Sequence, residues 1–268
     1  MTAERIRQTF AEAKQRGRTA LVVYLTIGDP SVEDSIACAL AALEAGADVL
    51  ELGVPFSDPT ADGPVIAQAS YRAIQSGGSL RAALRVAEAV RARSQAPLVL
   101  FSYYNPVLFY GEVALAEAAA QSGVDGLLLV DLPPEEGASL RAAADAQHLA
   151  IIPLLAPTSG PDRVARALEG AKGFVYYVSL TGVTGAAAAP LEEAGAAAAR
   201  LRERAGLPVV VGFGIDSAAK ARAVAGQGVD GVVVGTAIVK AISGAPNSAA
   251  RVAAVRALVS ELRAGLDG

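Results

Sequence analysis

The chain has almost none of the residues that form disulfides or bind metal ions. Its 268 residues include one cysteine, Cys38, and one histidine, His148. One cysteine cannot form a disulfide within the chain, and Cys38 lies in an apolar helical stretch, which is typical of a small buried side chain. One cysteine and one histidine do not supply the ligand cluster of a zinc site. We therefore expect neither a disulfide nor a bound metal.

Basic clusters and long hydrophobic runs are also missing. The 23 basic and 27 acidic residues give a net charge of −4, and no five basic residues are consecutive, so we do not expect a nucleic-acid surface. No run reaches 18 apolar residues, and the first 17 residues have no apolar signal core. These 17 residues instead show helical charge spacing. We expect an N-terminal helix, no membrane contact and a cytoplasmic protein.

What is present is an alternation of short apolar runs and amphipathic stretches. The apolar runs do not alternate with polar residues, which is typical of parallel strands covered on both faces. The predicted strands are residues 21–28, 49–53, 97–103, 126–131, 150–156, 174–179, 208–214 and 231–235. Predicted helices between them include residues 32–46, 80–93, 133–147 and 216–228.

A glycine-x-aspartate triplet precedes three of these runs, at residues 46–48, 123–125 and 228–230. Each glycine can adopt the left-handed conformation that ends a helix before the chain turns into a strand. Eight strand–helix units of about 33 residues match a (β/α)8 TIM barrel. A doubly wound sheet fits less well, because no G-x-G-x-x-G follows the first strand. We predict one TIM-barrel domain over residues 1–268, with an extra N-terminal helix.

Two carboxylates stand at the strand ends where such barrels place their active sites. Glu51 lies within an apolar strand, where a buried carboxylate is costly without a partner or a task. The other interpretation is a charge on the helix-facing side, paired with an arginine. Asp62 lies in the long loop that follows, where an Asx turn before Gly63 is the structural alternative. The functional interpretation is an acid–base pair across the barrel mouth, with environments that separate the two pKa values.

Glycines at three other strand ends suggest a phosphate site. Gly214 follows the seventh strand, Gly235 and Thr236 follow the eighth and open a helix, and residues 182–185 follow the sixth. Backbone N–H groups at a helix N-terminus attract anions, and many barrels bind phosphate at these positions. Each glycine could otherwise simply end its strand in a tight turn.

Five segments together resemble the tryptophan synthase alpha chain family: LTIGDP (25–30), LELGVPFSDPTADGP (50–64), YYNPVLFYG (103–111), GVTG (182–185) and GFGI (212–215). The resemblance implies cleavage of indole-3-glycerol phosphate to indole and glyceraldehyde 3-phosphate, without a cofactor or metal. It implies that Glu51 and Asp62 are catalytic. The substrate-binding positions that it implies are Tyr24, Tyr103, Leu128, Tyr176, Thr184, Gly185, Phe213, Gly214, Gly235 and Thr236.

The resemblance also implies a partner, a tryptophan synthase beta chain in an alpha2beta2 tetramer that receives the indole. The matching interface positions are Pro55, Asp58, Asn105 and Pro133. Two positions depart from the pattern. Leu180 stands where enterobacterial members have an arginine, which implies that loop closure is stabilised differently. Thr236 replaces a serine but keeps a hydroxyl donor.

The chemistry of the reaction favours Asp62 at the indole N1–H, and Glu51 at the proton transfers at C3 and at the glycerol hydroxyl. The order of these transfers stays open, and either carboxylate could in principle serve both ends. Three other functions remain open at this point. The same barrel and carboxylates could serve a stand-alone lyase that releases free indole. A catalytically silent activator of a beta chain would not need both carboxylates. Another phosphosugar barrel, such as an isomerase, would need only the phosphate site.

Overall fold

The computed structural model describes residues 2–178, 191–212 and 214–268. Within these residues, nine strands form one sheet in which every recorded pairing is parallel, with the order β5-β4-β3-β2-β1-β9-β8-β7-β6. The strands are β1 (Ala20–Thr26), β2 (Val49–Gly53), β3 (Leu98–Ser102), β4 (Gly126–Leu129), β5 (Ala150–Ile151), β6 (Leu154–Leu155), β7 (Val175–Val178), β8 (Val209–Gly212) and β9 (Gly231–Val234).

The sheet closes into a barrel through its two shortest strands. Among the described strands, β5 pairs only with β4 and β6 pairs only with β7. Ile152 and Pro153 separate β5 from β6 in sequence. The predicted strand 150–156 is therefore two strands, not one. Pro153 has no N–H group to donate to a ladder, so regular pairing stops there. The nine strands correspond to the eight positions of a TIM barrel.

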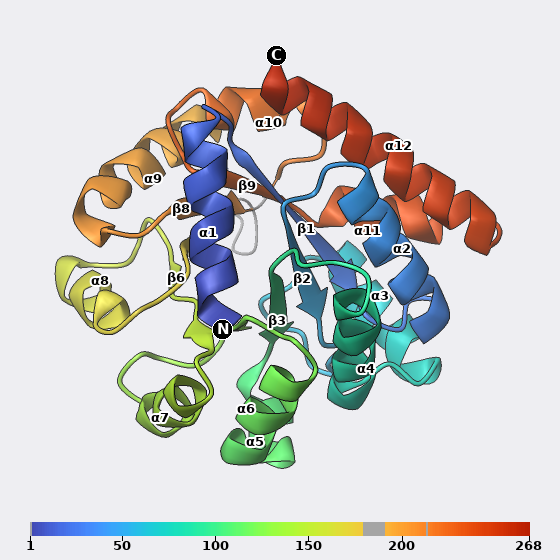
Figure 1. Ribbon diagram of the computed structural model, residues 1–268, viewed down its shortest axis with the longest axis horizontal. Helices are drawn as coiled ribbons and strands as arrows, with labels where there is room; N and C mark the ends of the chain where they lie inside the picture. The colour runs from blue at the N-terminus through green and yellow to red at the C-terminus, as the bar shows by residue number, and fades with distance from the viewer. Residues whose placement is uncertain (1, 179–190, 213) are drawn as a thin grey trace.

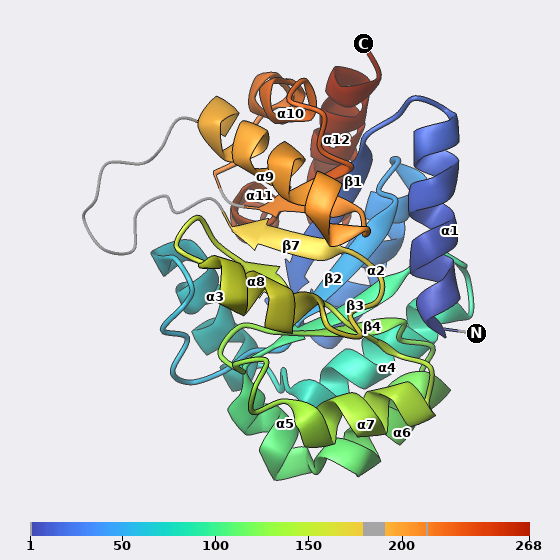
Figure 2. The same cartoon turned by 90° about the vertical axis from the view of Figure 1, so that its left-hand side faces the viewer.

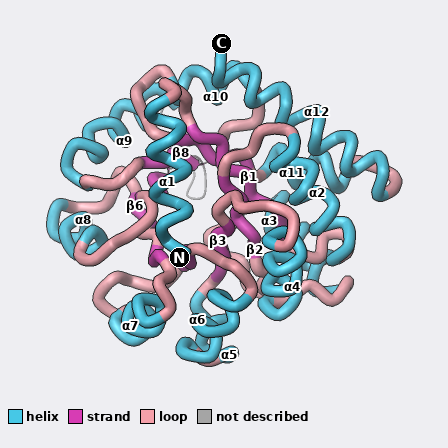
Figure 3. The backbone as a smooth tube through the Cα atoms, viewed as in Figure 1, coloured by secondary structure: helices cyan, strands magenta, loops and turns pink. Residues whose placement is uncertain are grey.

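Helices surround the barrel (Figures 1 and 3). In the described residues they are α1 (Thr2–Gln15), α2 (Val32–Glu44), α3 (Pro64–Gln75), α4 (Leu80–Arg91), α5 (Tyr104–Tyr110), α6 (Glu112–Gln121), α7 (Ala138–Ala146), α8 (Pro161–Leu168), α9 (Leu191–Ala205), α10 (Ala218–Ala225), α11 (Thr236–Ser243) and α12 (Ser248–Asp267). None of these helices is long and apolar enough to cross a membrane.

All four of the helices predicted between the strands extend too far. Most clearly, α7 begins at Ala138 and not at Pro133, because Glu136 N–H donates to the Pro133 carbonyl and Gly137 N–H to the Pro134 carbonyl, which are turn contacts. Residues 216–228 shorten to α10, since the Ser217 side chain accepts from the Lys220 N–H and caps the helix there. Residues 32–46 and 80–93 lose only their last two positions.

The core has two layers, as strands buried on both faces require. The outer layer packs between the strands and the surrounding helices, and includes Leu50 and Leu52 of β2. The inner layer fills the barrel and includes Val49 of β2. Alternate strand residues point to opposite faces, so β2 places its third residue, Glu51, inside the barrel.

The predicted N-terminal helix, α1, covers the end of the barrel where the strands begin. Ile6, Phe10 and Ala13 are buried in the inner layer, and the Phe10 ring lies 5.4 Å from that of Phe174. Figure 2 shows α1 and α3 on opposite sides of the barrel. One end of the barrel is therefore closed, and the other remains for ligands.

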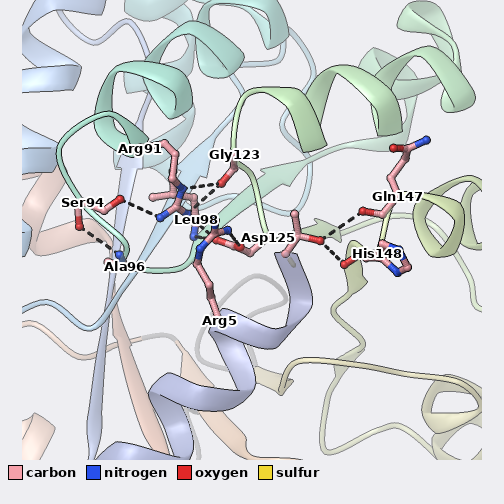
Figure 4. Close-up of polar contacts among 10 residues, drawn as sticks. Arg5, Arg91, Ser94, Ala96, Leu98, Gly123, Asp125, Gln147 and His148 are labelled. Carbon is pink, nitrogen blue, oxygen red and sulfur yellow. Dashed lines mark hydrogen bonds and ion pairs between the residues drawn. The ribbon is translucent and has the colours of Figure 1, made fainter.

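Asp125 fastens α1 to the barrel (Figure 4). This fully buried carboxylate accepts hydrogen bonds from Arg5 of α1 (2.6 Å), from Arg91 of α4 (2.7 Å) and from the Leu98 N–H (2.9 Å). The Thr2 hydroxyl adds a hydrogen bond to the carbonyl of His148. Removing one partner of a buried ion pair strongly destabilises the protein, because the other charge stays buried without compensation.

The three glycine-x-aspartate triplets have a structural role in common. Their glycines have φ angles of 110°, 80° and 85°, as the prediction of left-handed helix ends requires. In each triplet the aspartate carboxylate accepts from the first N–H groups of a neighbouring strand, at Leu21, Leu98 and Val209. Each also pairs with at least one arginine. The repeated triplet is thus a structural device at the closed end of the barrel.

Candidate functional site

A cavity of about 400 Å³ opens at the carboxyl ends of the strands. Six of the positions predicted from the sequence to act on substrate line it: Tyr24, Asp62, Tyr176, Gly214, Gly235 and Thr236. Its other lining residues are Ile66, Phe101, Ile215, Asp216, Val233, Ala237, Lys240 and Leu258. The wall is therefore mostly apolar, with carboxylates at Asp62 and Asp216 and a group of backbone and polar positions around α11.

Glu51 lies inside the barrel beneath this cavity. It is the registered partner of Tyr24 on β1 and of Val99 on β3. Its side chain has no exposed surface, and neither carboxylate oxygen has a hydrogen-bond partner among the described residues. Burial alone raises the pKa of Glu51 from 4.5 to about 8. The interpretation of Glu51 as a helix-facing charge paired with an arginine is wrong.

Asp62 occupies the loop between β2 and α3 and is half-buried. Burial raises its pKa from 3.8 to about 6, and a hydrogen bond with the Tyr103 hydroxyl lowers it by a smaller amount. That hydroxyl also accepts from the Ala61 N–H at 2.9 Å, which holds the loop next to the carboxylate. An Asx turn at Asp62 would need the N–H of the residue two positions later, and that residue is Pro64, which has no N–H, so the loop cannot adopt this alternative.

The helix that follows Asp62 is anchored from outside the cavity. α3 begins at Pro64, directly after Gly63 as its N-cap. Arg72 of α3 donates two hydrogen bonds to Asp29, at 2.9 and 2.7 Å, and Asp29 is 5% exposed. A bidentate pair of this kind fixes direction as well as distance. It limits how far α3, and with it Asp62, can move.

Three aromatic rings form the wall above Glu51. The Phe101 ring lies 5.3 Å from that of Tyr24 and 6.3 Å from that of Tyr176. Burial raises the pKa of both tyrosines, so they remain neutral hydroxyls. A methyl group at Gly53 would overlap the Tyr24 hydroxyl, and one at Gly212 would overlap that of Tyr176. Each ring therefore needs the glycine on the neighbouring strand.

Another part of the cavity wall combines two glycines with the start of α11. Gly214 has a φ of 75°, a conformation that favours glycine. α11 begins at Thr236, and no side chain caps its N-terminus by a hydrogen bond. The first N–H groups of a helix have no partner within it, so those of α11 can bind a ligand. The partial positive charge of that terminus favours an anion.

Several predicted positions lie elsewhere. Leu128 is fully buried in the inner layer, and Tyr103 lies behind Asp62, with its ring 5.1 Å from that of Phe56. Thr184, Gly185 and Phe213 lie outside the described residues, as does Leu180.

The four predicted interface positions differ in exposure. Asp58 and Asn105 are exposed, Pro133 is half-buried, and Pro55 is buried. Exposed apolar side chains stand near Asn105 on α5 and α6, with Leu108, Phe109 and Val113 57%, 95% and 61% exposed. Such a group of large exposed apolar residues is typical of a protein-interaction surface.

Three cavity-lining residues that the motifs in the sequence did not single out could have been found from their spacing in strands or in a helix. Phe101 and Val233 belong to predicted strands, and their inward-pointing alternation with buried neighbours could have placed them in the barrel. Lys240 stands four residues after Thr236, so the two share one face of α11. That spacing was the available signal.

Comparison with known proteins assigns the family. The family model described as "Tryptophan synthase alpha chain" matches residues 10–266. A tryptophan synthase alpha chain of Geobacter sulfurreducens is 50% identical over 236 residues, 88% of this chain and 89% of the relative. One from Dechloromonas aromatica is 48% identical over 98% of both chains. The crystal structure of tryptophan synthase subunit alpha from Legionella pneumophila superposes with a TM-score of 0.91 at 35% identity, covering 100% of this chain and 99% of that one. This chain belongs to the tryptophan synthase alpha chain family.

Proposed function

We propose that Glu51 and Asp62 are the acid–base pair with which this lyase, a single TIM-barrel domain over residues 1–268, cleaves indole-3-glycerol phosphate to indole and glyceraldehyde 3-phosphate. One observation carries the proposal: two carboxylates, Asp62 lining the cavity and Glu51 buried beneath it, lie in different environments, and the charges of both act on Tyr24 and Tyr176. Burial raises the pKa of Glu51 to about 8 and that of Asp62 to about 6. At neutral pH the first is mostly protonated and the second mostly ionised, which suits an acid and a base.

The first step makes indole a leaving group. The Glu51 carboxylic acid donates its proton to indole C3, which becomes tetrahedral, and the positive charge spreads to N1. The Asp62 carboxylate accepts a hydrogen bond from N1–H and stabilises that charge. The aromatic wall of Tyr24, Phe101 and Tyr176 gives the flat ring an apolar surface to bind.

The second step breaks the carbon–carbon bond. The Glu51 carboxylate, now ionised, takes the proton of the adjacent glycerol hydroxyl, whose oxygen forms the aldehyde carbonyl. The electron pair of the broken bond returns to indole C3 and restores the aromatic ring. Glu51 ends protonated, ready for the next turnover, so one buried carboxyl group performs both transfers.

The phosphate of the substrate is proposed to bind at the α11 side of the cavity. The uncapped N-terminus of α11, at Gly235 and Thr236, and the backbone at Gly214 offer N–H donors. Thr184 and Gly185 are proposed to complete this end, and Phe213, Leu128 and Tyr103 to border the indole. Binding at one side and chemistry at the other would orient the glycerol chain between them.

A tryptophan synthase beta chain is the proposed partner, in an alpha2beta2 tetramer that receives indole directly. The exposed apolar residues Leu108 and Phe109 beside Asn105 support a protein partner at the barrel mouth. Exposed Asp58 is proposed to contact that partner, with Pro133 beside it. Buried Pro55 is proposed to shape the loop that does so. The rival is a stand-alone lyase that releases free indole.

Indole release with and without a beta chain tests the proposal. Wild type should form indole, and the beta chain should raise the rate at least about tenfold, within the usual allosteric coupling of 1–3 kcal/mol. The mixture should elute as a heterotetramer on a sizing column. Glu51→Gln should abolish indole formation while retaining a cooperative unfolding transition. Activity in that variant would refute the catalytic assignment, and no stimulation and no shift in elution would favour the stand-alone lyase.

A further inference from the structure

One lysine lies in the cavity without a described role. Of the described residues that line it, Lys240 alone has a cationic side chain, and that side chain is exposed. It belongs to α11, the helix whose uncapped N-terminus borders the same cavity. No acidic group within the described residues pairs with its ammonium.

The other two charged residues that line the cavity in the described part of the chain, Asp216 and Asp62, differ from Lys240 because each has a partner. Asp216 also lines it, but its carboxylate forms an ion pair with Lys220 at 2.8 Å. Asp62 enters from the loop that leads into α3, a helix that packs against α11, and its carboxylate accepts a hydrogen bond from the Tyr103 hydroxyl. Both acids that line the cavity therefore have a partner, whereas the Lys240 ammonium has none among the described residues. A free ammonium next to a ligand cavity attracts an anion from solution and stabilises it after binding.

The geometry of a helix directs this lysine toward the phosphate end. Residues four apart lie on one face of a helix, so Lys240 stands one turn below Thr236. Helical side chains tilt toward the N-terminus, so the long lysine arm extends over the first turn of α11. The ammonium and the first N–H groups of α11 then face the same volume.

We propose that Lys240 supplies the cationic charge that selects and holds the substrate phosphate dianion, in addition to the backbone N–H groups of α11. This inference rests on the proposed phosphate end of the cavity. It assigns to a side chain the part of the binding that depends on charge and salt. Backbone donors alone would bind through short-range hydrogen bonds, whereas an exposed ammonium acts through a field that salt screens.

Calorimetric titration with glycerol 3-phosphate, which carries the phosphate without the indole, tests the inference. Lys240→Met should weaken binding about tenfold at low salt, equal to about 1.4 kcal/mol. The difference from wild type should shrink in high salt, because the Debye length falls from about 10 Å at 0.1 M to about 3 Å at 1 M. Lys240→Arg keeps the charge and should retain most of the affinity.

The matched control is Lys172→Met, which removes the same charge from a lysine that pairs with Asp145 outside the cavity. It should bind as wild type does. If Lys240→Met binds glycerol 3-phosphate as tightly as wild type, or if Lys172→Met loses as much affinity as Lys240→Met, the role of Lys240 is overturned. The proposed phosphate site at the start of α11 would not be affected by either result. Failure of wild type itself to bind glycerol 3-phosphate would overturn both proposals.

Discussion

Replacing Glu51 by glutamine should change how the stability of the protein depends on pH. Glu51 is fully buried, and burial raises its pKa from 4.5 to about 8. Between these values the folded state retains a proton that the unfolded chain has lost. Wild-type stability therefore falls as pH rises through this window and levels off above the folded pKa. Below pH 4.5 Glu51 is protonated in both the folded and the unfolded state, so its ionisation no longer lowers the free energy of unfolding.

The size of the effect follows from the same two values. A difference of about 3.5 pH units at 1.36 kcal/mol per unit makes the full cost about 5 kcal/mol. Little of this cost is present at pH 5 and nearly all of it at pH 9. The wild-type free energy of unfolding should therefore fall by about 4 kcal/mol across that range. Glutamine does not ionise, and its buried amide adds an offset that is the same at each pH.

Urea unfolding of wild type and Glu51→Gln at pH 5, 7 and 9 measures this difference. The free energy of unfolding of the variant should rise relative to wild type by roughly 3–4 kcal/mol from pH 5 to pH 9. The comparison is made between pH values, so the constant amide offset cancels. A difference that stays the same from pH 5 to pH 9 would refute the assignment of a raised pKa to a buried, unpartnered Glu51.

Four further substitutions test other parts of the account. Asp62→Asn should lower the rate of indole formation by about 10² or more, since one acid–base group is lost, and a rate within about threefold of wild type would contradict its role. Asp58→Ala should weaken activation by a beta chain more than it lowers the basal rate, which paired assays with and without the partner measure. Asp125→Ala leaves two arginines without their carboxylate and should cost about 3–5 kcal/mol in denaturant unfolding, whereas a loss below about 1 kcal/mol would make the pairing a surface-like one. Gly214→Val places a branched side chain at a φ of 75° beside the phosphate end and should raise the KM, and an unchanged KM would argue against phosphate binding there.

Much of the fold could be predicted because each barrel strand is a short apolar run between helices. The same property does not reveal which face of its strand carries the Glu51 side chain. Every other residue of β2 is apolar or glycine, so no alternation of polar residues distinguishes the inner face from the outer one. Only the two packing layers, with Val49 inside and Leu50 outside, assign Glu51 to the interior.

Where the apolar pattern predicts the wrong boundaries of a strand or helix, local backbone chemistry sets the observed ones. Pro153 divides a continuous apolar run into β5 and β6, although hydropathy does not change there. Turn hydrogen bonds to Pro133 and Pro134 delay α7 in a segment whose acids and alanines read as helical. Lys240 is not predicted from the sequence for a different reason: it lies one turn into the helix that follows a strand, and not at the strand end itself.

The division of labour between Glu51 and Asp62 is tested most directly by the pH dependence of kcat/KM for cleavage of indole-3-glycerol phosphate. Wild type should give a bell-shaped profile that rises through pH about 6, as Asp62 ionises, and falls above pH about 8, as Glu51 loses its proton. The substrate phosphate also ionises at about pH 6, so the acid limb of Asp62→Asn should be less steep than that of wild type, and its alkaline limb should be unchanged. A wild-type profile that is flat from pH 5 to pH 9, or an acid limb that is as steep in Asp62→Asn as in wild type, would contradict this account.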